Sequence, residues 1–592
     1  MTAGILPLLL VLGNHSAPSA ISAAFDNFNA KYLYGDAAAR ILDSNRFEDE
    51  YDFIIIGAGS GGCVMANRLS AVSGWKVLLL EAGEEENLML SVPLLADLNV
   101  RTDYNWKYAF EPTPSACVTL PGGVCPVPRG RGLGGSSLLN YMVYTRGHHR
   151  DYDKWAEAGN RGWSYEDVKK YFEKGEQSFI HPSLNSFKSP LLDEFKQSIF
   201  ESGYGEITSK NRSQIGYYKL RSTTIRGQRN SAARIYLHPV RNRRNLHISV
   251  RSHASKILID PDTKRAFGVE FIKDGRTLQV KAKKEIILSA GTIGSAQLLL
   301  LSGIGPKDHL TSLGIPIIKS LPVGQNLHDH YGTVQLRFQF KQKLPECSSN
   351  EAFSKYINEG SGPLSVPFGI ESIGFLKTAS SQLPKDYPDF EAIFLGIQLQ
   401  RSQSKAFALL GLDQILDDLF TINNNNFSSF TLGFLYLQPK SRGYITLKSG
   451  NPLDHPRIVS NYFSHPDDSA NVREAIKQAI RVGESEQLLE FGSKLSEDFA
   501  PNCKGFSIET DDFWDCFMKH YIVSAYHIAG TCKMGPDGDA SAVVNPELKV
   551  RGIKGLRVVD ASVMPSPIAG HPNAAVFMIA EKAADMVKSS WN

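Results

Sequence analysis

The stretch Phe53-Ile-Ile-Ile-Gly-Ala-Gly-Ser-Gly-Gly62 places an apolar run directly before a glycine-rich turn. A second apolar run, Val77-Leu-Leu-Leu80, ends at the acidic residue Glu81, 24 residues beyond Gly57. This order predicts a strand, a glycine turn, a helix, a second strand and an acid, which is the arrangement that binds a dinucleotide.

The positions of this motif have separate expected roles. Gly57 allows a tight turn, Gly59 lets the backbone approach a pyrophosphate, and Gly62 lets the helix pack closely on the strand. The helix that follows offers free N–H groups and a positive dipole end to phosphates. Glu81 is placed to hold a ribose hydroxyl, and a carboxylate favours a ribose diol over a 2′-phosphate.

The bulk composition predicts a large globular protein. At 592 residues the chain is too long for one ordinary core, which indicates two large domains or one domain with a large insertion. Hydrophobic residues make up 42% and charged residues 21% of the chain. The net charge of +3, with no basic run interleaved with aromatic residues, favours no acidic partner and no nucleic acid.

The N-terminus and the cysteines favour a secreted or extracellular protein. The apolar run Ile5–Leu12 and the small residues after it fit a signal peptide over 1–24, and the run is too short to span a bilayer. Sequons at Asn211 and Asn426 would permit glycosylation. The close pairs of cysteines allow two small disulfide rings, Cys117 with Cys125 and Cys503 with Cys516.

The remaining cysteine and histidine positions predict no metal site. No Cys/His spacing matches a zinc site. Cys63 lies in the first expected helix and is interpreted as a buried apolar residue rather than a reactive thiol.

The apolar pattern changes along the chain. Residues 285–290 form a continuous apolar run before the helical segment 295–301, and residues 556–560 form a closing strand that ends in an acid. Between them, 333–340 and 430–437 alternate as in a mostly antiparallel sheet. The predicted fold class is an α/β Rossmann-like dinucleotide-binding domain, split in sequence, plus an α+β substrate domain.

The domain boundaries follow from this change of pattern. We expect the first part of the nucleotide-binding domain over 50–330, with excursions into the other domain. The substrate domain is expected over 331–525, and the closing part of the nucleotide-binding domain over 526–592. Separate short strands are expected at 278–280 and 285–290, and a helical region at about 468–490.

Four motifs, taken in order, resemble the glucose-methanol-choline (GMC) oxidoreductase family. Gly130-Arg-Gly-Leu-Gly-Gly-Ser-Ser-Leu-Leu-Asn140 is similar to the first family signature, and residues 291–305 are similar to the second. Residues 322–330 and 526–535 are also similar to family segments. The resemblance runs from about Asp52 to Val587, is weaker in the centre, and is closest in style to arthropod members.

The resemblance implies FAD as the cofactor, and it implies which residues bind it. The implied FAD-binding residues are Gly57, Gly59, Ser60, Gly62, Glu81, Arg131, Gly134, Gly135, Ser136, Asn140, Ala254, Asp560, Ala561 and Asn573.

Two histidines near the C-terminus, His527 and His571, match the family's active-site pair. Alcohol oxidation removes a proton from the hydroxyl and a hydride from its carbon, and the flavin accepts the hydride. Histidine is the side chain that titrates near neutral pH, so it suits proton transfer there. The expected proton acceptor is His527, while His571 holds the hydroxyl oxygen and shares its developing charge.

The other histidines are interpreted as structural. His148 and His149 are interpreted as an exposed charged turn, and His328 and His330 as packing beside the cofactor. Tyr526 is expected to line the substrate pocket or to pack beneath the flavin.

The expected function is FAD-dependent oxidation of the CH–OH group of a small alcohol, with oxygen or a quinone as electron acceptor. Aryl alcohols, cyanohydrins, sugars and steroids all remain open as substrates. A hydroxynitrile lyase with a structural FAD is the alternative, followed by a non-catalytic flavin-binding protein. No residue pattern specifies an oligomeric state.

Overall fold

The computed structural model describes residues 40–185, 187–208, 214–340, 342, 344, 349–397 and 428–591. The expected signal peptide over 1–24 and the sequons at Asn211 and Asn426 lie outside these residues. Over the described ranges, no helix combines the length and the apolar composition that crossing a membrane requires.

A seven-stranded sheet carries the glycine turn. Its strands run in the spatial order β10, β2, β1, β13, β12 and β11, and β24 also pairs with β13. The pairs among β10, β2, β1, β13 and β24 are parallel, and those that join β13, β12 and β11 are antiparallel. The strands are β1 (Glu50–Ile56), β2 (Val77–Leu80), β10 (Leu246–Ser249), β11 (Ser252–Ile259), β12 (Ala266–Lys273), β13 (Arg276–Leu288) and β24 (Leu556–Val558).

One strand, β13, replaces the two short strands expected at 278–280 and 285–290. Its first half pairs antiparallel with β12, and its second half pairs parallel with β1 and β24. Lysines at 281, 283 and 284 interrupt the apolar pattern where the strand changes partners. The two-strand prediction was wrong because the backbone pairing continues through these polar side chains.

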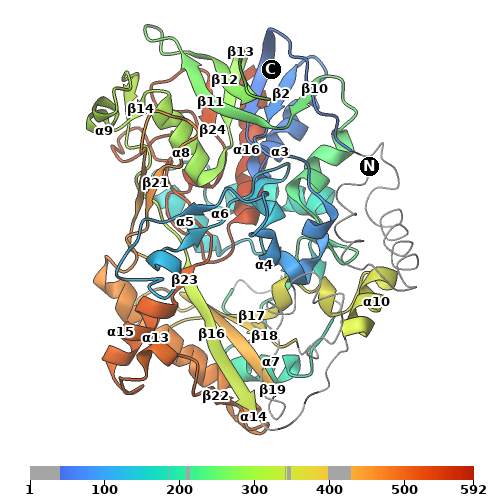
Figure 1. The fold of residues 1–592 in the computed structure, drawn as a ribbon, viewed down its shortest axis with the longest axis vertical. Coiled ribbons are helices and arrows are strands. Elements are labelled where there is room, and N and C mark those ends of the chain that lie inside the picture. The colour runs from blue at the N-terminus through green and yellow to red at the C-terminus, as the bar shows by residue number, and fades with distance from the viewer. Residues whose placement is uncertain are drawn as a thin grey trace.

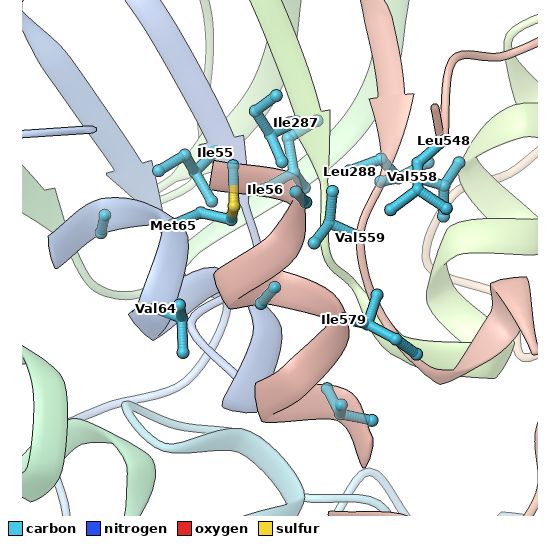
Figure 2. Packing of buried hydrophobic residues seen from close by; sticks show 14 of the residues in the cluster. Ile55, Ile56, Val64, Met65, Ile287, Leu288, Leu548, Val558, Val559 and Ile579 are labelled. Atoms are coloured by element: carbon cyan, nitrogen blue, oxygen red, sulfur yellow. The ribbon is translucent and has the colours of Figure 1, made fainter. Parts of the chain in front are cut away.

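Two helices from opposite ends of the chain cover the parallel strands. Figure 1 shows α16 (Asn573–Trp591, red) beside α3 (Ser60–Leu69, blue) in the upper part of the molecule. Arg68 of α3 makes an ion pair of 2.6 Å with the fully buried Glu581 of α16. In Figure 2 the apolar side chains between strands and helices converge, among them Ile55, Ile56, Val64, Met65, Ile287, Leu288, Leu548, Val558, Val559 and Ile579.

The second sheet is antiparallel and lies in the lower part of Figure 1. Its spatial order is β22, β16, β19, β18, β17 and β6, with β23 also paired to β16. The strands are β6 (Gly216–Lys219), β16 (Tyr331–Phe340), β17 (Ile370–Leu376), β18 (Phe390–Leu395), β19 (Ser428–Tyr436), β22 (Lys494–Leu495) and β23 (Val523–Ser524). This sheet and the split nucleotide-binding sheet together confirm the predicted fold class.

The alternation of residues along β18 gives the second sheet two different faces. Phe390, Ala392 and Phe394 are buried in the core formed with α7 (Leu192–Glu201), α13 (Pro466–Gly483) and α15 (Asp511–Tyr521). The other three residues of β18, at 391, 393 and 395, point to the opposite face because side chains alternate along a strand. We call this second face the cavity face.

The helical region expected at about 468–490 is two helices. The first, α13, ends at Gly483, and α14 (Glu486–Leu489) begins after the N-cap residue Ser485. Glycine and a serine N-cap are ordinary signals for the end of one helix and the start of another.

Both expected disulfides form, Cys117–Cys125 and Cys503–Cys516. Three of these four cysteines belong to the buried core beneath the second sheet. The first sheet contains no disulfide within the described ranges. Its core instead contains the buried free cysteines Cys63 and Cys532, which confirms the interpretation of Cys63.

Candidate active site

A cavity of about 450 Å³ lies between the two sheets. Its walls include the carboxyl ends of β1 and β2 at Ile56 and Leu80, and residues of the second sheet such as Ile393 and Gly433. Ligands of open α/β sheets bind at the carboxyl ends of the parallel strands. The cavity volume is also within the usual range for small-molecule sites.

Gly57 and Gly62 of the turn leave no room for side chains. Gly57 has a φ of +94°, and a Cβ there would lie 2.5 Å from the Ser289 carbonyl oxygen. A Cβ on Gly62 would lie 1.8 Å from the Gly57 carbonyl oxygen. Gly135 crosses the turn so closely that its Cβ would lie 2.5 Å from Gly59 Cα. The turn is therefore a bare backbone cradle of the kind that a pyrophosphate requires.

Glu81 is tied to this cradle by its own carboxylate. Oε2 accepts a hydrogen bond of 2.8 Å from the Ala58 N–H, and Oε1 accepts one of 2.9 Å from the Gly83 N–H. Burial raises the pKa of Glu81, while these backbone hydrogen bonds act in the opposite direction. The side chain both lines the cavity and fixes the turn.

Asp560 makes the equivalent connection at the other end of the chain. Its Oδ2 accepts hydrogen bonds from the Gly291 N–H at 2.9 Å and from the Ser295 hydroxyl at 2.6 Å. Its Oδ1 accepts one of 2.8 Å from the Ser562 N–H. Asp560 thus joins the loop after β24 to the N-terminus of α8 (Gly291–Leu301).

Two further helix N-termini meet at the cavity. The hydroxyl of Ser60, the first residue of α3, donates a hydrogen bond of 2.6 Å to Oδ1 of Asn573, the first residue of α16. Both residues line the cavity. The positive ends of these helices favour a negatively charged group between them, which suits the phosphates of a dinucleotide.

The structure brings most of the predicted site residues to this one cavity and leaves three outside its lining. Gly62 packs against Gly57, and the Gly134 N–H donates a hydrogen bond of 2.8 Å to the Ala58 carbonyl. Arg131 is exposed, with its guanidinium 5.3 Å from the centre of the Trp106 ring. The predicted residues that line the cavity are Gly57, Gly59, Ser60, Glu81, Gly135, Ser136, Asn140, Ala254, Tyr526, His527, Asp560, Ala561, His571 and Asn573.

The histidines His527 and His571 face each other, with ring centres 4.7 Å apart and planes inclined at 72°. The backbone N–H of His527 donates a hydrogen bond of 2.8 Å to Asp329 Oδ1. The ring Nδ1 of His527 lies 3.0 Å from His330 Nδ1. Burial, with smaller contributions from the neighbouring histidines and Arg129, holds the pKa of His527 well below its ordinary value. The imidazole of His527 is therefore neutral at neutral pH.

The surroundings of His571 are different. Its backbone N–H donates a hydrogen bond of 2.8 Å to Thr145 Oγ1, and its Nε2 lies 3.1 Å from Oε2 of Glu391. Glu391 is fully buried on the cavity face of β18. The two imidazoles thus have opposite electrostatic environments, one next to histidines and one next to a carboxylate.

Sequence reasoning missed Glu391 and underestimated His330. Glu391 could have been recognised from the sequence because it is an acid within the apolar run Phe390–Leu395, and a buried charge requires a specific partner. The interpretation of His330 as packing beside the cofactor missed its contact with His527. His328 packs as expected, with Nε2 3.3 Å from the Met564 carbonyl.

The interpretation of His148 as part of an exposed turn was wrong. His148 is fully buried and is the N-cap of α5 (His149–Glu157), where its Nδ1 accepts a hydrogen bond of 3.2 Å from the Arg150 N–H. The neighbouring Asp151 completes the cap by accepting a hydrogen bond from the His148 N–H. Histidine is an unusual N-cap residue, so residue type alone gave no signal for this role.

Tyr526 lies in the cavity wall next to His527. Its φ is +64°, and its carbonyl accepts a hydrogen bond from the guanidinium of Arg129. A non-glycine residue in the left-handed region is uncommon and marks a strained position that the surrounding structure maintains.

Comparisons with known proteins agree with this arrangement. GMC oxidoreductase sequences match residues 51–332 and 439–580. The chain is 36% identical to "Glucose dehydrogenase [FAD, quinone]" of Drosophila melanogaster, over 93% of this chain and 89% of that protein. It is also 36% identical to human mitochondrial choline dehydrogenase, over 93% and 92% of the two chains.

Solved structures give the same result. Pyridoxine 4-oxidase from Mesorbium loti is similar with a TM-score of 0.74 and 26% identity, over 90% of this chain and 98% of that one. Formate oxidase is similar with a TM-score of 0.77 and 25% identity, over 92% and 99%. The chain therefore belongs to the GMC oxidoreductase family, and it is an FAD-dependent enzyme that acts on CH–OH groups.

Proposed function

We propose that this chain oxidises the CH–OH group of a small alcohol, with His527 as the proton acceptor and His571 as the group that holds the hydroxyl oxygen. The observation that carries the proposal is the pair of imidazoles 4.7 Å apart in the same cavity as the glycine cradle. Their different partners support different roles.

The cofactor residues are proposed from the shape of the cradle. The bare backbone at Gly57, Gly59 and Gly135 accommodates the pyrophosphate of FAD, and Glu81 and Ala254 lie where the ADP end would be held. The remaining proposed contacts are Ser60, Ser136, Asn140, Asp560, Ala561 and Asn573. When bound, FAD supplies the acceptor for the hydride.

His527 accepts the proton because its surroundings keep it neutral and correctly oriented. Asp329 fixes its backbone, and His330 occupies its Nδ1, so Nε2 is the nitrogen left for the substrate hydroxyl. A neutral imidazole has the free lone pair that a general base requires.

His571 complements this base. Because Glu391 occupies its Nε2, Nδ1 is the nitrogen left for the substrate oxygen. The contact with Glu391 orients the His571 ring, which then holds the substrate oxygen as that oxygen loses its proton to His527.

The test is flavin reduction under anaerobic conditions. Adding an alcohol should bleach the flavin of the wild-type holoenzyme, and His527→Asn should slow the bleaching by about 10²- to 10⁴-fold, the usual scale of general base catalysis. His465→Asn is a matched control because the partly buried His465 is not in the cavity lining and caps α13, a role that asparagine also fills.

Two outcomes would contradict the proposal. The first is wild-type flavin reduction by the His527→Asn variant at unchanged FAD content. The second is cleavage of a cyanohydrin with no change in the visible spectrum, which would support the lyase.

We also propose that the protein is secreted and that oxygen or a quinone reoxidises the cofactor. The two disulfides support secretion because such bonds persist in oxidising compartments. The relatives support either acceptor, since one is named for quinone and others are named oxygen-dependent choline dehydrogenase. Peroxide release on admission of air would support oxygen as the acceptor.

A further inference from the structure

We propose that the substrate is an apolar alcohol, whose aromatic or aliphatic body packs on the cavity face of the second sheet, rather than a polyol or a quaternary ammonium alcohol. This inference rests on the proposed function and names the substrate class of the same site. It departs from the glucose and choline of the relatives' names.

Strand β18 runs from the two histidines along the wall of the cavity. Glu391 of this strand contacts His571 at the reaction centre, and Ile393 and Leu395 follow on the same face and line the cavity. Alternate residues of a strand are about 6–7 Å apart. A molecule whose hydroxyl lies at the two histidines therefore extends over Ile393 and toward Leu395.

Gly433 of the neighbouring strand β19 pairs with Ile393 of β18. Its φ is not in the left-handed region, so backbone conformation does not require glycine there. A Cβ at this position would lie 3.3 Å from Ile393 Cβ, 3.7 Å from Leu395 Cδ1 and 3.7 Å from Val334 Cγ1. Three apolar side chains thus surround Gly433 closely, and an added methyl group at this point of the cavity lining would crowd them.

Val334 of β16 lies next to Gly433. It lies at an irregularity in β16, between the pairs that Thr333 and Leu336 make with β19. Its side chain is 47% exposed and lines the cavity. An exposed apolar side chain in the cavity lining next to Gly433 provides a contact surface for the apolar part of a substrate.

Two hydroxyl groups of the cavity lining already have protein partners. The Ser524 hydroxyl donates to Asp329 and accepts from the Tyr526 N–H, and Thr333 Oγ1 accepts from the Gln335 N–H. The hydroxyls of a sugar would lose their hydrogen bonds to water, and the apolar side chains around Gly433 could not replace them. Hydroxyls buried without partners weaken binding, and a polyol is disfavoured for this reason.

A cationic alcohol is disfavoured on separate grounds. The rings of Tyr141 and Phe368 stack on each other, with centres 4.1 Å apart and planes at 8°, so the two facing surfaces are closed to a cation. Asp97 also lines the cavity and accepts a hydrogen bond of 3.0 Å from the Tyr141 hydroxyl, but it belongs to α4 (Ala96–Asn99) and not to the sheet on which the substrate is placed. Recognition of a quaternary ammonium uses open aromatic faces.

The experiment compares three alcohols on the holoenzyme by anaerobic flavin reduction. We expect benzyl alcohol to reduce the flavin with a second-order rate constant at least about 100-fold above those of glucose and choline, the usual scale of discrimination by pocket chemistry. A faster reaction with glucose or choline would overturn the inference and leave the proposed function intact. Reduction by dithionite but by no alcohol would overturn both.

A variant locates the effect. Gly433→Ala should lower the rate constant for benzyl alcohol by about tenfold or more relative to that for ethanol, since one added methyl group in a pocket has this order of effect. Ethanol is too small to contact the added methyl group, so a slower reaction with ethanol would show that the substitution disturbs the enzyme in general. Gly450→Ala is the matched control, because a Cβ there meets nothing within 4 Å. An unchanged ratio of benzyl alcohol to ethanol in Gly433→Ala would overturn the placement of the substrate.

Discussion

The two sheets of this enzyme contribute to one cavity in different ways. The nucleotide-binding sheet presents backbone, because its strands end in glycine turns and helix N-termini at Gly57, Ser60 and Gly291. The antiparallel sheet presents side chains from one face, among them Glu391 and Ile393. A site made of backbone depends on a few residue types at fixed spacing, whereas a site made of side chains can change at every position of the strand.

The difference explains why the cofactor could be predicted and the substrate could not. A dinucleotide cradle requires glycine wherever a Cβ would collide with backbone, so its sequence is constrained. The cavity face of β18 requires only that a strand form, and strands accept many residues. The following predictions test this contrast, from the largest expected effect to the smallest.

The largest effect is expected at the cradle. Gly57→Val should abolish most FAD binding, because the φ of +94° and a Cβ 2.5 Å from the Ser289 carbonyl oxygen would force the turn to move. Strain of this kind costs about 1–3 kcal/mol before the overlap is counted, which already predicts a loss of about 5- to 150-fold in affinity. The measurement is the absorbance of bound flavin per chain.

Gly74→Val is the control for this variant, since a Cβ at that exposed position meets nothing within 4 Å. Full flavin content in Gly57→Val would show that the cradle tolerates a side chain and would remove the contrast between the two sheets.

A smaller effect is expected at Glu391, on the second sheet. Glu391→Gln keeps a hydrogen-bond acceptor next to His571 but removes the negative charge. Hydrogen bonds to charged groups contribute about 1.5–3 kcal/mol, so the rate of flavin reduction should fall by about 10- to 100-fold while FAD content stays unchanged.

Glu371→Gln is the matched control for Glu391→Gln. Glu371 is a buried acid of the neighbouring strand β17, and it accepts a hydrogen bond of 2.7 Å from the Ser189 N–H rather than facing His571. Equal losses of rate in the two variants would mean that Glu391 acts only through the stability of the sheet.

The smallest effect on catalysis is expected from the disulfides, which belong to the second region alone. Replacing Cys503 and Cys516 by serine opens a ring with a sequence separation of 13 and should lower the free energy of unfolding by about 3 kcal/mol. Urea unfolding measures this loss, and the rate of flavin reduction in the folded enzyme should not change. A loss of FAD at low urea concentration would show that the disulfide also supports the cradle.

Much of the architecture could be predicted because local rules specify it. The glycine motif and the apolar pattern predicted β1, α3 and β16 to within a few residues. The prediction failed where tertiary pairing overrode the local pattern, as at β13, where lysines lie within a continuous strand. It also failed at His148, which caps a helix although its residue type is rare in that role.

The resemblance of the sequence to the GMC family pointed to His527 and His571. The sequence by itself determined the nucleotide-binding motif and its completion by residues from the far end of the chain. These features follow from short-range spacing and from steric limits on backbone. Only the tertiary structure decided which groups surround each histidine, because Glu391 and His330 lie 180 and 197 residues away from the imidazoles that they contact. Contacts of that range depend on how two sheets pack, and no local pattern encodes them.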